Sequence, residues 1–278
     1  MKKISRRSFL AAAGLTVAAL ALTACGGSAS TASSAASSVA ASSESASTSA
    51  AELTTVEAGK LTMATNATFP PYEMTTDAGT IEGIDVETAQ AIADKLGLEL
   101  QIDDMDFDAA LLSVQQGKAD IVMAGVTVTD ERKNVMDFSD SYATGIQSII
   151  VPEGSNIASP DDLAGKKIGT QRGTTGYIYC SDDFGDDAVV AYDNGLTAVQ
   201  ALNNGQVDAV VIDNAPAKEY VAANPGLVIL ETSYAEEDYA IGMAKGNTAL
   251  EDAVNAALEE LKADGTLQSI VDKYITAE

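Results

Sequence analysis

The sequence predicts an α/β protein with two lobes, and three observations lead to this prediction. Short apolar strand patterns alternate with helix patterns from residue 60 onward, which is typical of parallel strands joined by crossover helices. The alternation restarts after Val151-Pro152, so we expect two such units. Two more helix patterns end the chain without a sheet of their own, and we expect them to pack on the first unit.

The first block shows helix boundaries as well as strand patterns. Asp85 is placed to cap a helix, and Gly97 and Gly117 are placed to end helices. The expected strands are 60–65, 99–102 and 120–124, and the expected helices are 86–96 and 107–116.

The second block repeats the pattern. The expected strands are 167–170, 189–192, 209–212, 227–230 and 239–243, and the expected helices are 176–181, 196–203 and 215–223, followed by the terminal helices 250–262 and 267–274. We expect the chain to cross between lobes twice, near 148–151 and 239–243, as a two-strand hinge beside a cleft. This assigns residues 56–150 and 241–278 to lobe 1 and residues 151–240 to lobe 2.

The first 55 residues predict export and attachment. Residues 1–24 combine Lys and Arg with an apolar run and small residues, as export signals do. The run is short for a transmembrane anchor and ends at Leu22-Thr23-Ala24-Cys25, which resembles a bacterial lipobox. We therefore expect Cys25 to carry a lipid and residues 25–55, rich in Ser and Ala, to be a flexible tether. Arg6-Arg7 leaves the export route open between the twin-arginine and the general pathway.

Composition excludes several classes of function. The formal charge of -25 opposes nucleic-acid binding. The absence of histidine removes the commonest general base and most transition-metal sites. We therefore expect no catalytic residues, no metal and no cofactor. Cys180 is interpreted as a small buried residue rather than a reactive thiol, because Asp182 and Asp183 would raise the pKa of a thiol.

Two clusters follow expected strands of the first block, where open α/β sheets bind ligands. In the first, Pro70-Pro71 stiffens a loop that carries Phe69 and Tyr72, which either line a ligand or fill the core. In the second, Arg132 follows a turn that Thr129 or Asp130 would cap. Its guanidinium either grips a carboxylate with two hydrogen bonds or forms a surface ion pair with Asp137 or Asp140.

A third cluster lies in the second block. Residues 170–176, which include Thr174 and Thr175, offer hydroxyls and free amides at a helix start, and these suit an anion. Asp213 ends an apolar strand and suits a cation. A carboxylate binder opposite a cation binder describes a site for a zwitterion. A phosphate loop is the rival interpretation, but its Gly-Lys-Ser/Thr ending is missing.

From Lys60 to Ile275 the sequence resembles the polar-amino-acid solute-binding proteins of ABC importers (bacterial extracellular solute-binding protein family 3), which have the type II periplasmic binding fold. The matching segments are 68–73, 83–87, 124–133, 135–140, 173–176, 208–213 and 261–267. Each is weak alone, but together and in order they are specific. The resemblance implies two lobes, each a mostly parallel sheet flanked by helices.

The resemblance also assigns roles to residues. It implies that Phe69 and Phe107 flank the ligand, and that Arg132 with the amides or hydroxyls of Thr127 and Thr175 holds its α-carboxylate. It also implies that Asp213 and the Gly125 carbonyl hold its α-ammonium, and that Asn66 and Gln171 line the side-chain pocket. Family members that select basic side chains often carry an acid where this chain has Asn66. This departure favours a neutral polar amino acid, such as cystine or glutamine. The role of Arg172 stays open.

The sequence therefore predicts a monomeric lipoprotein on the outer face of a bacterial cell membrane, which binds an amino acid and delivers it to an ABC permease. Two alternatives come from other classes. One is a dehydratase-type enzyme on the same scaffold, which would recruit Glu73 or Asp213. The other is a sensor module that presents its ligand to a receptor.

Overall fold

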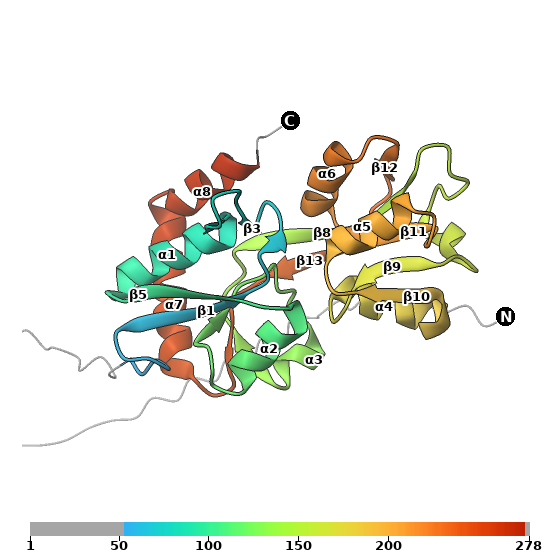
Figure 1. The fold of residues 1–278 in the computed structure, drawn as a ribbon. Coiled ribbons are helices and arrows are strands. Elements are labelled where there is room, and N and C mark those ends of the chain that lie inside the picture. The colour runs from blue at the N-terminus through green and yellow to red at the C-terminus, as the bar shows by residue number, and fades with distance from the viewer. Residues whose placement is uncertain (1–52, 276–278) are drawn as a thin grey trace, which may run out of the picture. The chain divides into compact units, whose positions relative to one another are not determined.

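The structure, a computed structural model, describes residues 53–275, in which helices and strands alternate as expected (Figure 1). The predicted export signal, Cys25 and nearly all of the predicted tether lie outside the described residues. Between residues 53 and 275, no helix has both the length and the apolar character that crossing a membrane requires.

The secondary-structure elements have the following bounds. The strands are β1 Lys60–Thr65, β2 Thr68–Phe69, β3 Glu73–Thr75, β4 Ile81–Glu82, β5 Glu99–Asp104, β6 Ile121–Val122, β7 Met136–Phe138, β8 Ala143–Pro152, β9 Ile168–Gln171, β10 Val189–Tyr192, β11 Ala209–Asp213, β12 Leu227–Ile229, β13 Ala235–Tyr239 and β14 Gly242–Ala244. The helices are α1 Ile84–Leu96, α2 Phe107–Gln115, α3 Asp130–Lys133, α4 Thr175–Phe184, α5 Gly195–Asn203, α6 Asn214–Ala223, α7 Thr248–Ala263 and α8 Thr266–Tyr274, with short 3-10 helices at Pro160–Leu163 and Asp186–Ala188.

Two sheets carry the fold, as the predicted two-lobed α/β class requires. The first has the strand order β5-β1-β6-β14-β7, and β1 runs parallel to both β5 and β6. The second has the order β10-β9-β11-β8-β12, with β13 also paired to β8, and β9 runs parallel to β10 and β11. The antiparallel strands β8 and β14 each follow a passage of the chain between the sheets. Each sheet therefore has a parallel core formed by its β-α-β units.

The passages between the sheets differ from those expected. The sequence predicts the first crossing at 148–151, but these residues lie inside β8 and pair with β11 and β12, so the chain crosses earlier, at 139–142. The expected strand 239–243 is divided between β13 and β14. It is interrupted because the N–H of Ala240 donates to the carbonyl of Val126 (3.1 Å), which ties the second crossing to a loop of the first sheet.

Helix α1 begins differently from the prediction. Its N-cap is Gly83, whose φ of 139° suits glycine, and a Cβ there would lie 2.1 Å from the Tyr72 carbonyl oxygen. Asp85, the expected cap, lies in the first turn and is fully buried. Its Oδ2 accepts a hydrogen bond from the Gly125 N–H (2.9 Å). The carboxylate therefore orients the loop after β6 rather than the helix end.

The terminal helices return to the first sheet, as expected. Helices α7 and α8 contact each other and α1 (Figure 1). The apolar face of α7, which includes Leu250, Val254 and Leu258, is fully buried, and burial of each such side chain stabilises the fold by roughly 1.5–3 kcal/mol. The short antiparallel sheet β2-β3-β4 was not predicted; it holds Phe69 and Glu73 in register.

Candidate ligand-binding cleft

A cavity lies where loops from the two sheets meet. It is lined by Asn66, Phe69, Glu73, Phe107, Ala124, Gly125, Thr127, Arg132, Gln171, Thr174, Thr175 and Asp213. Only about 10 Å³ of it is wide enough for the centre of a water molecule, because side chains from the two sides contact each other across it. The structure thus brings together every predicted ligand residue except Tyr72.

The strands position these residues by ending at the same place. Asn66 follows β1, Gly125 follows β6, Gln171 ends β9 and Asp213 ends β11. The carboxyl ends of neighbouring parallel strands meet at one edge of a sheet, where open α/β folds form their ligand sites. At Gly125 (φ 55°) a Cβ would lie 2.8 Å from the Phe69 ring, so glycine permits this close approach.

Arg132 occupies one end of the cavity. The Thr129 hydroxyl caps α3 by accepting from the Arg132 N–H (3.1 Å). The guanidinium donates to the carbonyl of Thr127 (2.8 Å, Nη1) and to that of Gly173 (3.1 Å, Nη2), and it lies 5.4 Å from the centroid of the Phe107 ring. Of the two interpretations, the surface ion pair is wrong, because Arg132 is only 8% exposed and Asp137 pairs with Lys245 instead.

The charge of Arg132 persists despite this burial. Burial lowers the pKa of the guanidinium, and nearby acidic groups, Glu237 first, oppose that shift. A guanidinium does not lose its proton in proteins. Two of its five N–H donors hold backbone carbonyls, so others are free to bind an anion in the cavity.

Hydroxyl groups surround the guanidinium. The Thr127 and Thr175 Oγ1 atoms lie 3.5 Å apart, and Thr175 is the first residue of α4, where the helix dipole is positive. Thr174 caps that helix by accepting from the Tyr177 N–H (3.4 Å), and its own hydroxyl donates to the Gln171 carbonyl (2.8 Å). Such an arrangement of donors at a helix start suits an anion.

Asp213 lines the cavity from the second sheet, at the end of β11. It is 8% exposed, pairs in register with Gln147 of β8, and accepts a hydrogen bond from the Tyr239 hydroxyl. Burial, followed by the charge of Glu237, raises the pKa of Asp213 to about 7, against the opposing effects of its hydrogen bonds with Tyr239 and Gln147. A cation in the cavity would stabilise the charged carboxylate.

Amide groups connect the two sides of the cleft. The Gln171 Nε2 donates to the Asn66 Oδ1 (3.0 Å), and the Asn66 Nδ2 donates to the carbonyl of Met105 (2.9 Å). Nearby, the Tyr220 hydroxyl of α6 donates to the Thr68 carbonyl (2.5 Å). These contacts join the loop after β1 to the second sheet.

Comparisons with known proteins agree with this geometry. The model of a family described as bacterial extracellular solute-binding proteins, family 3, matches residues 61–277. The chain belongs to this family. The fold and the family inferred from the sequence are thereby confirmed, and the family 3 assignment identifies the chain as an exported solute-binding protein.

Relatives of this family 3 protein include binding proteins for several amino acids. It is 34% identical to a probable histidine-binding protein of Neisseria gonorrhoeae, over 96% of this chain and 95% of that one. It is also 34% identical to the L-cystine-binding protein TcyJ of Escherichia coli (80% and 85%). A solved structure of an ancestral arginine-binding protein bound to glutamine matches with a TM-score of 0.76 and 42% identity, covering 80% of this chain and all of that one.

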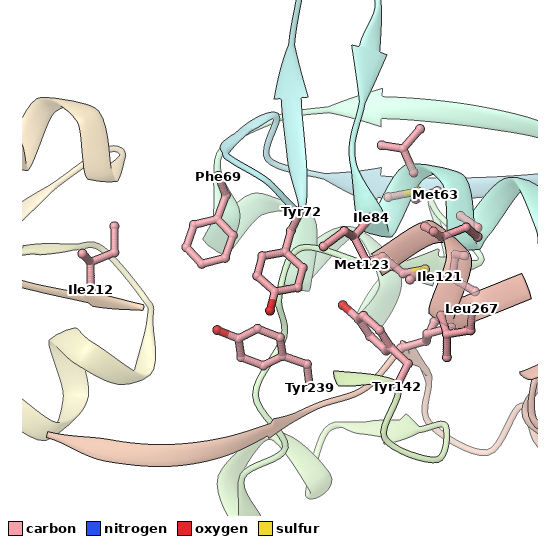
Figure 2. Close-up of a cluster of buried hydrophobic side chains, with 14 of the residues drawn as sticks. Met63, Phe69, Tyr72, Ile84, Ile121, Met123, Tyr142, Ile212, Tyr239 and Leu267 are labelled. Atoms are coloured by element: carbon pink, nitrogen blue, oxygen red, sulfur yellow. The ribbon is translucent and has the colours of Figure 1, made fainter. Parts of the chain in front are cut away.

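Tyr72 is the one predicted ligand residue of this family 3 protein that does not line the cavity. It stacks on Phe69 (5.8 Å between ring centroids) and meets the Tyr239 ring edge-on (5.4 Å), so that the three rings form one cluster (Figure 2). Of the two interpretations that the sequence left open, Phe69 is a wall and Tyr72 belongs to the core.

Several buried polar residues around the cleft were not predicted as ligand-site groups. They are Glu73, which lines the cavity, and Asp85, Gln147, Glu237 and Tyr239, which lie behind it or contact its lining residues. Both carboxyl oxygens of Glu73 are buried without a hydrogen-bond partner among the described residues. Burial, with Asp85 next, raises the pKa of Glu73 well above its usual range.

Two residues left open by the sequence lie away from the cavity lining. Arg172 is exposed and lies 3.6 Å from Asp193, so it faces solvent. Cys180 is fully buried among apolar residues of the second sheet, and burial raises the pKa of its thiol to about 12. Its interpretation as a small buried residue is confirmed.

Proposed function

We propose that this protein captures an α-amino acid in the cleft and delivers it to the permease of an ABC importer. The observation that carries the proposal is a buried guanidinium and a buried carboxylate, Arg132 and Asp213, which both line one cavity. A zwitterion has the matching pair of charges. The amino acids named for its relatives, which include histidine and cystine, support the same class.

The α-carboxylate would be held by Arg132 together with the backbone amides or the hydroxyls of Thr127 and Thr175. Charge-assisted hydrogen bonds to a guanidinium are about twice as strong as neutral ones. The α-ammonium would be held by Asp213 and by the carbonyl of Gly125, whose loop is fixed by Asp85. Thr127 and Arg132 belong to the first sheet's side of the cleft and Thr175 and Asp213 to the second, so the ligand would bridge two lobes.

The first candidate for the side chain is neutral and polar. The amides of Asn66 and Gln171 hydrogen-bond each other at 3.0 Å and would exchange that bond for bonds to a ligand amide or similar group. An acid is absent at Asn66, which supports a neutral side chain such as that of glutamine or cystine.

A second candidate, a cationic side chain, is favoured by charge. Glu73 and Asp213 line the cavity, and Asp85 and Glu237 are buried next to its lining residues, whereas Arg132 is the only cation among the described lining residues. A ligand with a second positive charge would offset this excess of acid.

A thermal-shift panel of the twenty amino acids and cystine, confirmed by calorimetry, tests the proposal. A ligand at about 100 times its dissociation constant stabilises the folded state by about 2.7 kcal/mol. We expect a shift with glutamine or cystine for the first candidate and with arginine or lysine for the second. An absence of any shift with every amino acid would contradict the proposed function.

The same proposal includes no enzymatic activity. Glu73 and Asp213 would be the acids of a dehydratase-type enzyme, but the opposed charges of Arg132 and Asp213 fit an intact zwitterion better. Recovery of the bound amino acid unchanged after long incubation, analysed by mass spectrometry, is the expected result. A sensor role predicts instead that the purified protein binds the amino acid but that deletion of its gene causes no defect in amino-acid uptake.

We also propose that the mature protein is a monomer anchored to the outer face of the membrane through lipid on Cys25. The lipobox-like Leu22-Thr23-Ala24-Cys25 supports the anchor, and the charge of -25 argues against electrostatic adhesion to anionic lipid. The wild type should partition into detergent and Cys25→Ser into the aqueous phase. Detergent partition of the exported variant would contradict the anchor.

A further inference from the structure

Strand β13 carries two buried side chains that contact residues lining the cleft. Glu237 and Tyr239 are two residues apart, so they share one face of the strand. Glu236, which precedes them, and Asp238, which lies between them, are exposed. The Tyr239 hydroxyl donates to Asp213, the acidic end of the site, and Glu237 contacts Thr127, at the anion-binding end. One strand thus contacts both ends of the proposed zwitterion site.

Glu237 is a buried carboxylate with an unusual set of partners. Its Oε2 accepts hydrogen bonds from the Thr127 hydroxyl (3.0 Å) and from the Gln147 amide (3.0 Å). Its Oε1 is buried without a hydrogen-bond partner, and no ion pair is recorded for it within residues 53–275. The charged groups around it are Arg132 from α3 and Asp213 from β11, with the hydroxyl of Tyr179 from α4.

The hydrogen bond from Thr127 has a direct consequence for an anionic ligand. A threonine hydroxyl has a single hydrogen, and here that hydrogen points to Glu237 rather than into the cavity. A ligand carboxylate at Arg132 would therefore meet the oxygen of Thr127 and, beyond it, a second carboxylate. Two like charges repel more strongly in a buried site than in water.

We propose that Glu237 is a positioning residue that weakens the grip on the ligand carboxylate, because it withdraws the Thr127 hydroxyl and adds a negative charge beside the anion-binding end. This inference rests on the proposed amino-acid binding. Its effect is specific to the carboxylate of the ligand. At the ammonium end the same charge is attractive, so a ligand without a free carboxylate gains nothing when Glu237 is neutralised.

The test compares Glu237→Gln with the wild type, using L-arginine, L-glutamine and their C-terminal amides as probes in calorimetry. The glutamine side chain keeps an oxygen that accepts from Thr127 and Gln147 but removes the charge. We expect the free amino acids that the wild type binds to bind about tenfold more tightly to the variant, and the amides to gain nothing. Asp238→Asn, an exposed neighbour on the same strand, is the matched control and should leave all affinities within twofold.

Two further variants separate the hydroxyl from the charge. Because Glu237→Gln keeps the oxygen that accepts from Thr127, its gain comes from the lost charge and should persist in a Thr127→Val background, which has no hydroxyl to withdraw. Glu237→Asp shortens the side chain and should give a smaller gain than Glu237→Gln; it also serves if the amide variant fails to fold.

The outcomes distinguish this inference from the proposed function. If the wild type binds arginine or glutamine and Glu237→Gln binds them no better, or if the amides gain equally, the inference is overturned while amino-acid binding stands. If Glu237→Gln loses affinity only for arginine, Glu237 is a direct ligand for a cationic side chain, which also overturns it. If neither protein binds either amino acid, the inference fails together with the choice of those ligands, and the full panel decides the proposed function.

Discussion

The two charged groups of the cleft respond differently to the same acidic neighbour, Glu237. The Arg132 guanidinium donates to two backbone carbonyls and lies over the Phe107 ring, and the charge of Glu237 opposes the lowering of its pKa by burial. Asp213 is surrounded by other ionisable groups, and burial with the charge of Glu237 brings its pKa to about 7. The guanidinium thus keeps its charge throughout the physiological range, whereas the carboxylate titrates within it.

This difference separates two properties of the site. In the proposed site, the Arg132 end would fix where an amino acid binds, because its donors are in place at any physiological pH. The Asp213 end would make binding depend on pH, because a neutral carboxyl group does not attract an ammonium. We therefore expect substitutions at the two ends to differ in their pH profiles as well as in their size.

The largest expected effect is that of Arg132→Ala. Removing one partner of a buried charge pair typically costs about 2 to 5 kcal/mol, so amino-acid affinity should fall by at least tenfold at every pH. Calorimetry measures the loss, and circular dichroism checks the fold. Arg172→Ala, which removes an exposed guanidinium paired with Asp193, is the control and should leave affinity unchanged. Equal affinities for Arg132→Ala and wild type would remove the anion end from the site.

The next effect concerns Asp213 and pH. With a pKa of about 7, Asp213 is mostly neutral at pH 6 and mostly charged at pH 8, so the affinity of the wild type should weaken about tenfold between pH 8 and pH 6. Asp213→Asn should bind more weakly at pH 8 and show a flatter profile. Asp182→Asn removes an exposed acid and serves as the control. A profile of Asp213→Asn as steep as that of the wild type would assign the titration to another group.

The contrast also shows what could be predicted from sequence. Arg132 and Asp213 were predicted because each follows an apolar strand, and strand ends converge in an α/β sheet. The alternation of strands and helices predicted the fold for the same reason: its periodicity is local. The lobe boundaries follow from longer contacts, and the chain enters the second sheet at Ala143 rather than near Ser148.

The missed residues are those whose roles depend on distant partners. Asp85 has the local pattern of a helix cap, but its hydrogen bond is to Gly125, forty residues away. Glu237 lies 110 residues from Thr127, in a strand that begins earlier than the expected one. An acidic residue in a strand of a protein with 41 acidic residues gives no local signal that it is buried.

A third prediction extends the comparison to stability. Glu73 is fully buried at the acidic side of the cavity, and its pKa is raised by burial and then by Asp85. The folded state therefore holds a proton that the unfolded state releases above its ordinary pKa near 4, so stability is present at low pH and is lost as pH rises. Each such group lowers the free energy of unfolding by up to about 1.4 kcal/mol per pH unit until its folded pKa is reached.

Glu73→Gln should remove this contribution. We expect the variant to lose less stability than the wild type between pH 5 and pH 8 in urea unfolding, by about 1 kcal/mol or more. Glu82→Gln, an exposed acid of the same short sheet, should follow the wild type. Parallel pH profiles for the wild type and Glu73→Gln would show that Glu73 holds no extra proton.

The smallest expected effect concerns a hydrogen bond that connects the two lobes. It tests whether this contact supports ligand binding by Arg132 and Asp213. The Tyr220 hydroxyl of α6 donates to the Thr68 carbonyl beside the cleft (2.5 Å), and Tyr220→Phe removes this hydrogen bond while keeping the ring. A net contribution of about 0.5–1.5 kcal/mol per hydrogen bond predicts an amino-acid affinity about threefold weaker, without a change in the pH profile set by Asp213. Tyr192→Phe, in β10 of the second sheet, is the control.

Small-angle scattering should show a larger radius of gyration for ligand-free Tyr220→Phe than for the wild type, and the same value for both at saturation. Identical radii without ligand, together with identical affinities, would show that this contact does not hold the lobes and that closure depends on the ligand's own bonds to the two ends.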